Sequence, residues 1–338
     1  MGTKFKIYKL MPLSTPSFKE QIRSKDILDI FEENYSVIVP VWIPLQVQWL
    51  NGVYTTFKDY EKFMIVVHLL SKTFEFYSKN FVKLSYEEYF DQSQIEIEKY
   101  NIMDIAKNLN IPKETARRKI KELEELGHIK RLQKKIVVDS DTWPNIQPIE
   151  TIKRLTRFLS TFSKILCEKK LIIEPVSSEQ LTKTIKEYFS HVWKLYYDMQ
   201  IPMLLNNKKI FKDLETFHIW GVCLVNQFIN SNRSDNSHMS KEYYLDKYIF
   251  TENHQETGVN AMSISDISGI PRATVIRKLN HLVKKKFLKI NNKKQYASSG
   301  HHIKTMLEIQ KKNFINLSKF IADIYNLNNY SKNKQNFS

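Results

Sequence analysis

The sequence predicts a mainly α-helical fold made of two tandem copies of one unit, each with flanking helices and a short β-hairpin. The chain has only seven glycines among 338 residues, and turn-rich β architectures and nucleotide-binding loops need glycine for close backbone approach. Apolar side chains recur at helical spacing, for example along residues 152–166. In addition, one segment of the chain matches a second segment 159 positions later.

The matching segments are Met103–Lys135 and Met262–Lys294, which align without a gap. Eleven of the 33 positions are identical, which is more than a shared composition gives. The identical residues of the first segment are Met103, Ile105, Ile111, Pro112, Thr115, Arg118, Lys119, Leu123, Lys130, Lys134 and Lys135.

Shorter matches extend the repeat on both sides. Upstream, Phe57-Lys58-Asp59-x-Glu61-x-Phe63 returns as Phe211-Lys212-Asp213-x-Glu215-x-Phe217. Downstream, Leu159-Ser160-x-Phe162 resembles Leu317-Ser318-x-Phe320. Residues 17–170 and 176–327 are therefore predicted to be two repeats, separated by the turn-like Glu174-Pro175. Their basic centres lie at about 100–140 and 260–298.

The first basic centre has the pattern of two helices joined by a tight turn and followed by a hairpin. Asp104 is a suitable N-cap for the first helix, and Asn110 ends that helix. The second helix begins at Pro112 and carries one apolar stripe, made of Ala116, Ile120 and Leu123. Gly127 is a standard helix terminator, and an extended segment begins at His128.

The second basic centre repeats this pattern with one difference. Ser263 is the expected N-cap, Gly269 supplies the tight turn and Pro271 starts the second helix. The apolar stripe consists of Val275, Leu279 and Leu282. Lys286 stands where the first copy has Gly127, and a lysine is unfavourable in left-handed geometry by roughly 1 kcal/mol. This helix is therefore expected to end differently.

A short helix, a turn, an amphipathic helix and a basic hairpin form the winged helix-turn-helix pattern. Pro112-Lys113-Glu114-Thr115-Ala116-Arg117-Arg118 resembles the start of the recognition helix in catabolite-activator-type regulators. The segment from Gly269 to Leu279 resembles MarR-type and IclR-type regulators. Each resemblance covers about 36 residues. Together they imply tandem duplicated winged helix-turn-helix units and a helix that faces double-stranded DNA.

The resemblance and the helical geometry together indicate which side chains would contact DNA. Positions opposite the apolar stripe, with the residues at the start of each helix, would read bases. Two threonines and the lysines at the hairpin tips would bind phosphates. The predicted set is Lys113, Glu114, Thr115, Arg117, Arg118, Lys121, Lys134 and Lys135 in the first copy, and Arg272, Thr274, Arg277, Lys278, Asn280, Lys293 and Lys294 in the second.

The charge distribution agrees with a polyanionic partner. The formal net charge is +16. Residues 102–138 hold ten Lys/Arg against five Asp/Glu, and residues 262–297 hold nine against one. Most of the excess positive charge therefore lies in the two basic centres, which favours DNA binding over a uniformly basic surface.

The remaining features predict a cytoplasmic protein that is neither a membrane protein nor an enzyme. The apolar run Phe63–Leu70 is too short to span a bilayer, and no secretory signal is recognisable. Cys167 and Cys223 cannot build a disulfide framework or a four-thiolate metal site. Because motifs for phosphate loops, zinc proteases and serine hydrolases are absent from the sequence, no catalytic residue, metal or cofactor is predicted.

We therefore expect a sequence-specific bacterial transcriptional regulator, acting either as a homodimer or as a pseudo-dimer within one chain. The alternatives are a plasmid-type replication initiator and a winged-helix module that docks proteins. Two further patterns have two readings each. Aromatic residues such as Phe74, Tyr77, Tyr196 and Tyr197 line an effector pocket or belong to the core, and the stripe Ile152–Leu166 is a coiled-coil seam or packs within the protein.

Overall fold

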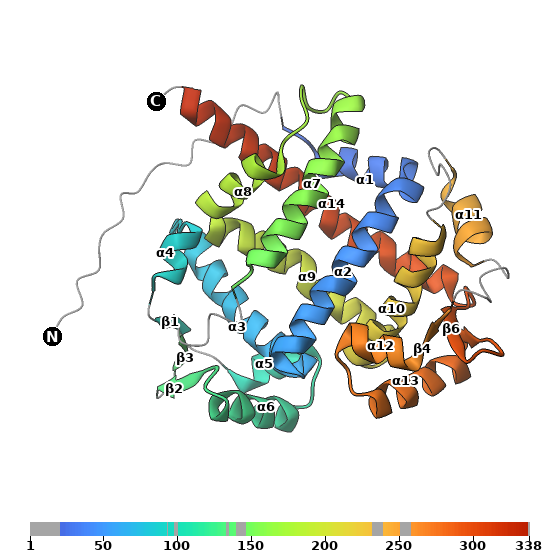
Figure 1. Cartoon of the computed structure of the whole chain (residues 1–338). Coiled ribbons are helices and arrows are strands. Elements are labelled where there is room, and N and C mark those ends of the chain that lie inside the picture. Colours follow the sequence, from blue (N-terminus) through green and yellow to red (C-terminus); the bar gives the residue numbers. More distant parts are fainter. Residues whose placement is uncertain are drawn as a thin grey trace.

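A computed structural model describes residues 21–92, 94–97, 101–132, 135–139, 147–231, 239–250 and 258–336. It is mainly helical, with short strands gathered in two small sheets (Figure 1), which confirms the predicted mainly α fold. Within these ranges, no helix combines the length and the hydrophobicity that a bilayer-spanning segment requires.

Residues 24–168 and 178–336 present the same order of elements. The first stretch contains α1 (Ser24–Glu33), α2 (Tyr35–Phe57), α3 (Tyr60–Lys79), α4 (Tyr86–Phe90), β1 (Gln94–Ile97), α5 (Ile102–Leu109), α6 (Lys113–Glu125), β2 (Lys130–Leu132), β3 (Lys135–Asp139) and α7 (Ile149–Glu168). The second contains α8 (Ser178–Glu187), α9 (Phe189–Phe211), α10 (Leu214–Ser231), α11 (Lys241–Tyr244) with the π-helical turn η3 (Leu245–Ile249), β4 (Val259–Asn260), α12 (Ala261–Ser268), α13 (Arg272–Lys284), β5 (Leu288–Ile290), β6 (Gln295–Ser298) and α14 (Ile303–Asn336).

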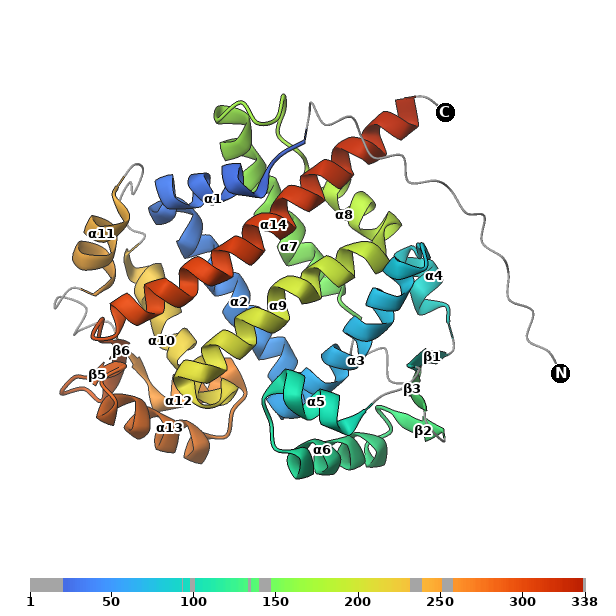
Figure 2. The ribbon, with the colours of Figure 1, turned by 180° about the vertical axis from the view of Figure 1, so that it is seen from behind.

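Long helices of each stretch pack against helices of the other stretch. Helix α2 packs on α10, and helix α9 packs on α3. Helix α14 runs across α1, α8 and α9, as both views of the ribbon show (Figures 1 and 2). One continuous hydrophobic core results, with buried side chains from Ile22 to Tyr325. Residues 24–168 and 178–336 thus share a core.

The apolar stripe Ile152–Leu166 and the aromatic residues, for which the sequence left two interpretations each, pack into this core. Helix α7 buries its apolar stripe against α2 and α8, so the stripe packs within the chain. Phe74, Tyr196 and Tyr197 are also buried, and Phe74 lies 5.9 Å from Tyr197 between ring centroids. None of these three side chains lines a described cavity of the structure.

The two small sheets have the same antiparallel arrangement. Their strand orders are β1-β3-β2 and β4-β6-β5, so the last strand of each sheet is the central one. In the first sheet Ile136 pairs with Ile97 and Arg131. In the second, Tyr296 pairs with Val259 and Ile290. Each sheet is therefore closed by a strand that precedes its helix pair in the chain.

Both short helices begin earlier than the sequence predicts. The N-cap of α5 is Asn101, whose side-chain oxygen accepts a hydrogen bond from the Met103 N–H at 2.8 Å. The N-cap of α12 is Asn260, which accepts from the Ser263 N–H at 2.9 Å. The predicted caps were wrong, because an asparagine three residues upstream performs the same role. Asp104 lies in the first turn of α5.

The second helices of the two centres end in the same way, so the expectation of a different end at Lys286 was wrong. Gly127 has φ of 74° and Lys286 has φ of 60°. At each end, the N–H groups of this residue and the next donate to carbonyls of the last helical turn, with N···O distances of 2.9–3.0 Å. Two backbone hydrogen bonds therefore hold Lys286 in a conformation that favours glycine.

Replacement of Lys286 by glycine is expected to stabilise the protein by about 0.5–1 kcal/mol, because it relieves the left-handed strain while both hydrogen bonds remain. Urea denaturation would measure this change. Gly127→Lys provides the reverse substitution in open space, since an added Cβ there meets nothing within 4 Å. We expect it to destabilise by about 1 kcal/mol. A loss of stability in Lys286→Gly would contradict the described helix end.

Candidate nucleic-acid interface

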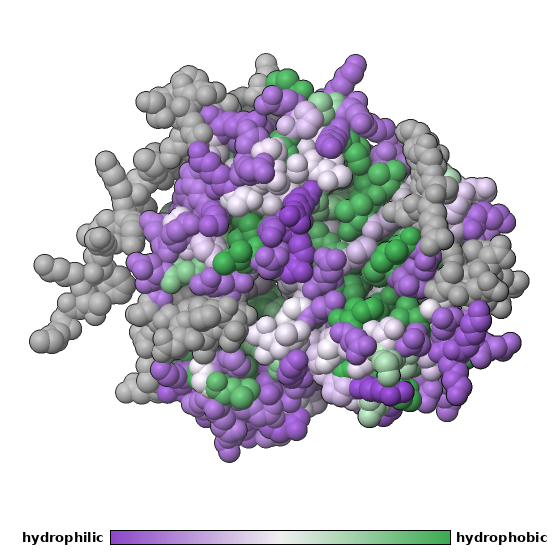
Figure 3. All heavy atoms as spheres, in the orientation of Figure 1, coloured by the Kyte–Doolittle hydropathy of each residue, from purple (hydrophilic) through white to green (hydrophobic). Residues whose placement is uncertain are grey.

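The helix pairs α5–α6 and α12–α13 bring the two basic centres to one edge of the molecule. Helices α6 and α13 lie along this edge in both ribbon views (Figures 1 and 2), and the small sheets flank them on the outer sides. The surface over α6 and α13 is mostly hydrophilic, whereas hydrophobic residues gather nearer the middle of this face (Figure 3). A single extended partner would therefore meet both helices from the same side.

The structure brings most of the predicted contact residues to this edge. Thr115 and Thr274 are half-buried where their helices begin. The exposed members are Lys113, Glu114, Arg117, Arg118 and Lys121 on α6, Arg272, Arg277 and Asn280 on α13, and Lys293 and Lys294 in the turn between β5 and β6. Lys135 is placed by its backbone in β3, and Lys134 lies outside the described residues.

Glutamates neutralise the exposed cations of α6. Arg117 contacts Glu114 at 3.0 Å, Arg118 lies 3.9 Å from Glu122, and Lys121 lies 3.6 Å from Glu125. This helix carries five Lys/Arg against four Glu. All three pairs are on the surface, where such pairs contribute little to stability. Their main effect is to reduce the positive potential that this helix presents.

Helix α13 presents a different electrostatic surface. It contains four Lys/Arg and no acidic residue. Within the described ranges, Arg272 and Arg277 are exposed and form no ion pair. The exposed run Lys284–Lys286 extends this positive surface at the end of the helix. The predicted contact set does not include that run, although three consecutive lysines are visible in the sequence.

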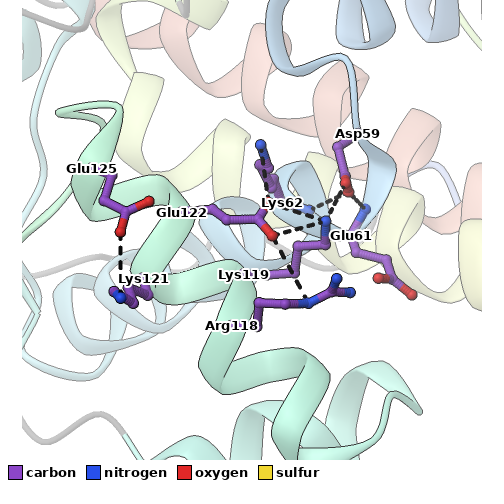
Figure 4. Close-up of polar contacts among 8 residues, drawn as sticks. All are labelled: Asp59, Glu61, Lys62, Arg118, Lys119, Lys121, Glu122 and Glu125. Atoms are coloured by element: carbon purple, nitrogen blue, oxygen red, sulfur yellow. Dashed lines mark hydrogen bonds and ion pairs between the residues drawn. The ribbon is translucent and has the colours of Figure 1, made fainter.

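An ion pair with the start of α3 holds α6 in place (Figure 4). Lys119 is nearly buried, and its ammonium lies 2.6 Å from the Asp59 carboxylate and 3.1 Å from Glu122. Glu122 also contacts Lys62 at 3.2 Å. The other oxygen of Asp59 caps α3 by accepting the Glu61 N–H at 2.8 Å. One carboxylate therefore joins the start of α3 to the inner side of α6.

The equivalent ion pair, with the start of α10, holds α13 in place. Lys278 lies 2.5 Å from Asp213, with 14% of its side chain exposed. Asp213 also accepts hydrogen bonds from the Thr216 N–H at 2.8 Å and from the Thr216 hydroxyl at 2.7 Å. The ammonium of Lys278 thus points inward, away from the face that carries Arg277. We therefore remove Lys278 from the contact set and assign it a positioning role.

These two pairs give a physical reason for the upstream repeat. Asp59 and Asp213 belong to the repeated Phe-Lys-Asp-x-Glu-x-Phe motif, and Lys119 and Lys278 belong to the repeated Arg-Lys dipeptide. Burial alone would raise the pKa of Asp213, but hydrogen bonds from Lys278 and Thr216 hold it below its usual value. The second helix of each pair is thereby held in place by an ion pair.

Each long central helix also ends against the helix pair of the other stretch. From the end of α9, the Lys208 ammonium donates to the carbonyls of Leu109 and Asn110 at 3.4 and 3.3 Å, at the turn after α5. From the end of α2, Tyr54 borders the turn after α12, where an added Cβ on Gly269 would lie 3.9 Å from its ring. Partial burial lowers the pKa of Lys208.

A cavity of about 250 Å³ lies where the starts of α3 and α10 meet the end of α9 and the turn after α5. Its walls include Asp59, Glu61, Lys208, Asp213 and Glu215. Burial raises the pKa of Glu215 above its usual value. Among the described residues, no group of His, Cys, Asp and Glu is arranged to hold a metal ion. Charged side chains at the starts of α3 and α10 and at the end of α9 therefore line this cavity.

Comparison of this chain with known families, curated proteins and solved structures finds no match.

Proposed function

We propose that this chain is a transcriptional regulator that binds double-stranded DNA through two winged helix-turn-helix units related by an internal duplication. In this proposal α5–α6 with β1–β3 form one unit, and α12–α13 with β4–β6 form the other. The common element order and the common strand order support the duplication. The resemblance of both second helices to the recognition helices of bacterial regulators supports the DNA-binding role.

One observation carries the proposal: both second helices lie along the same edge with exposed arginines, and a lysine on the inner side of each forms an ion pair with an aspartate. Cations on one edge attract a polyanion along its length. Fixed helices hold side chains in position to read base edges. The two units would then act as a pseudo-dimer within one chain, on a site with two unlike halves.

The unlike charges of the two helices predict unequal contributions to affinity. Arg277→Ala is expected to weaken DNA binding by about 1–3 kcal/mol, which is about 5- to 150-fold, because this arginine has no competing carboxylate in the described structure. Arg118→Ala is expected to cost less, because Glu122 already lies near its guanidinium. Fluorescence anisotropy with a labelled random-sequence duplex, repeated over a range of salt concentrations, measures both.

Arg157→Ala is the matched control, because Arg157 is an exposed arginine on α7, outside the candidate edge. It should leave affinity and salt dependence unchanged. For Arg277→Ala, the slope of log affinity against log salt should fall by about 1 if the arginine neutralises a phosphate. Equal weakening by all three substitutions would mean that only overall charge matters, and would contradict the proposed interface.

A further inference from the structure

A second cavity lies between the second small sheet and helices α2, α9, α10 and α14. Its volume is about 110 Å³, and its walls are aromatic and aliphatic, including Trp42 of α2, Trp220 of α10 and Phe314 of α14. Phe287, which follows α13, and Gly300, which follows β6, close it from the side of the second small sheet. The cavity thus lies where this sheet rests on the central helices.

One polar side chain in this wall has no hydrogen-bond partner among the described residues. Gln46 of α2 is 4% exposed, and neither its amide nitrogen nor its amide oxygen is hydrogen-bonded. Two other polar side chains of the wall are hydrogen-bonded: the Tyr35 hydroxyl donates to Gln310 at 2.8 Å, and the Asn207 amide donates to the Met203 carbonyl at 2.9 Å. Buried polar groups are normally satisfied, so an unpaired amide indicates a missing partner.

The chemistry of the wall defines that partner. No Lys, Arg, Asp or Glu is among the described lining residues, so a charged ligand would lose its hydration without compensation. An apolar cavity of about 150 Å³ accommodates one benzene ring, so this smaller cavity accepts at most a single ring. Rings of Trp42, Trp220 and Phe314 offer faces and edges for aromatic contact.

We propose that this cavity is a binding site for a small uncharged ring that carries neighbouring N–H and C=O groups, as in a cyclic amide. The Gln46 oxygen would accept the ligand N–H, and the Gln46 NH₂ would donate to the ligand carbonyl. This site does not depend on the proposed DNA binding. Its ligand would contact both the second small sheet and the central helices, so bound ligand would stabilise their contact.

The test uses 2-pyridone and N-methyl-2-pyridone, which share the ring and the carbonyl but differ in the N–H. Binding to the full chain is followed by thermal unfolding and by tryptophan fluorescence, because Trp42 and Trp220 line the cavity. The wild type should bind 2-pyridone at millimolar concentration and bind the N-methyl compound about tenfold more weakly, since the methyl group removes a buried hydrogen bond.

Gln46→Leu should bind both compounds equally and fold at least as stably as the wild type, because it removes an unpaired buried amide. Leu307→Trp fills the cavity from α14, keeps Gln46, and should bind neither compound. If Gln46→Leu does not fold, the wild type and Leu307→Trp still decide the question. Equal binding of both compounds by the wild type, undiminished binding in Leu307→Trp, or no binding at all would overturn the proposal.

Discussion

Asp213→Ala is expected to destabilise the protein by about 3 kcal/mol and to weaken DNA binding with it. The substitution removes the cap of α10 at Thr216, which contributes about 1 kcal/mol. It also leaves the nearly buried Lys278 ammonium without its described partner. Losing one member of a fully buried pair costs 3–5 kcal/mol, and the partial exposure of Asp213 reduces that to about 2 kcal/mol. Urea denaturation measures the sum.

Three further variants separate the parts of this effect. Asp213→Asn retains a capping oxygen and should lose only the ion pair. The double variant Asp213→Ala/Lys278→Met should be more stable than Asp213→Ala, because it removes the unpaired charge. Asp59→Ala should cost less, since Glu122 remains beside Lys119. If the double variant were no more stable than Asp213→Ala, the ion pair would have no anchoring role.

The second large effect is a loss of stability at acidic pH caused by His218. This residue is fully buried in α10, where Nδ1 lies 2.7 Å from the Tyr60 hydroxyl and Nε2 lies 2.6 Å from the Asn51 side-chain oxygen. Because Asn51 presents an acceptor, Nε2 carries the proton and Nδ1 accepts from Tyr60. Burial lowers the pKa of His218 to about 3. The neutral ring therefore joins α2, α3 and α10.

The sign of the pH effect follows from this lowered pKa. The unfolded chain binds a proton near pH 6.5, whereas the folded chain resists protonation until about pH 3. The contribution is complete above about pH 6.5 and declines as pH falls, by about 3 kcal/mol between about pH 7 and about pH 4.5. Urea denaturation at a series of pH values should show this loss in the wild type, and a correspondingly shallower pH dependence in His218→Gln.

Other histidines with lowered pKa values, His68 and His191 among them, contribute equally to wild type and variant, so the difference isolates His218. His301→Gln is the control, because His301 is exposed. It should follow the wild-type pH dependence. Parallel pH profiles for His218→Gln and the wild type would show that residue 218 does not bind a proton on unfolding.

The helix pairs were predictable from sequence because they rest on local patterns. The apolar stripe of α6, the turn at Asn110 and the end at Gly127 each depend on residues within a few positions of one another. The caps were less predictable, since Asn101 and Asp104 are both acceptable N-cap residues three positions apart. The choice between them depends on where the first helical turn begins, which is at Ile102.

The two ion pairs, Asp59–Lys119 and Asp213–Lys278, and the apolar cavity depend on contacts that sequence spacing does not reveal. Asp59 and Lys119 are 60 positions apart, and the repeated motif shows that both matter without showing that they meet. The wall of the apolar cavity comes from helices and a sheet far apart in the chain, so Gln46 appears in the sequence as an ordinary polar residue of a helix. The end of α13 at Lys286 was mispredicted because two backbone hydrogen bonds outweigh the local strain.

We propose that the two unlike helix pairs read two unlike half-sites. The deciding experiment is selection of bound sequences from random duplex DNA, with the wild type, Arg118→Ala and Arg277→Ala in parallel. We expect a motif with two parts. Arg277→Ala should weaken the base preference in one part, and Arg118→Ala should weaken it in the other. Salt-sensitive binding without a motif, or the absence of DNA binding, would contradict the claim.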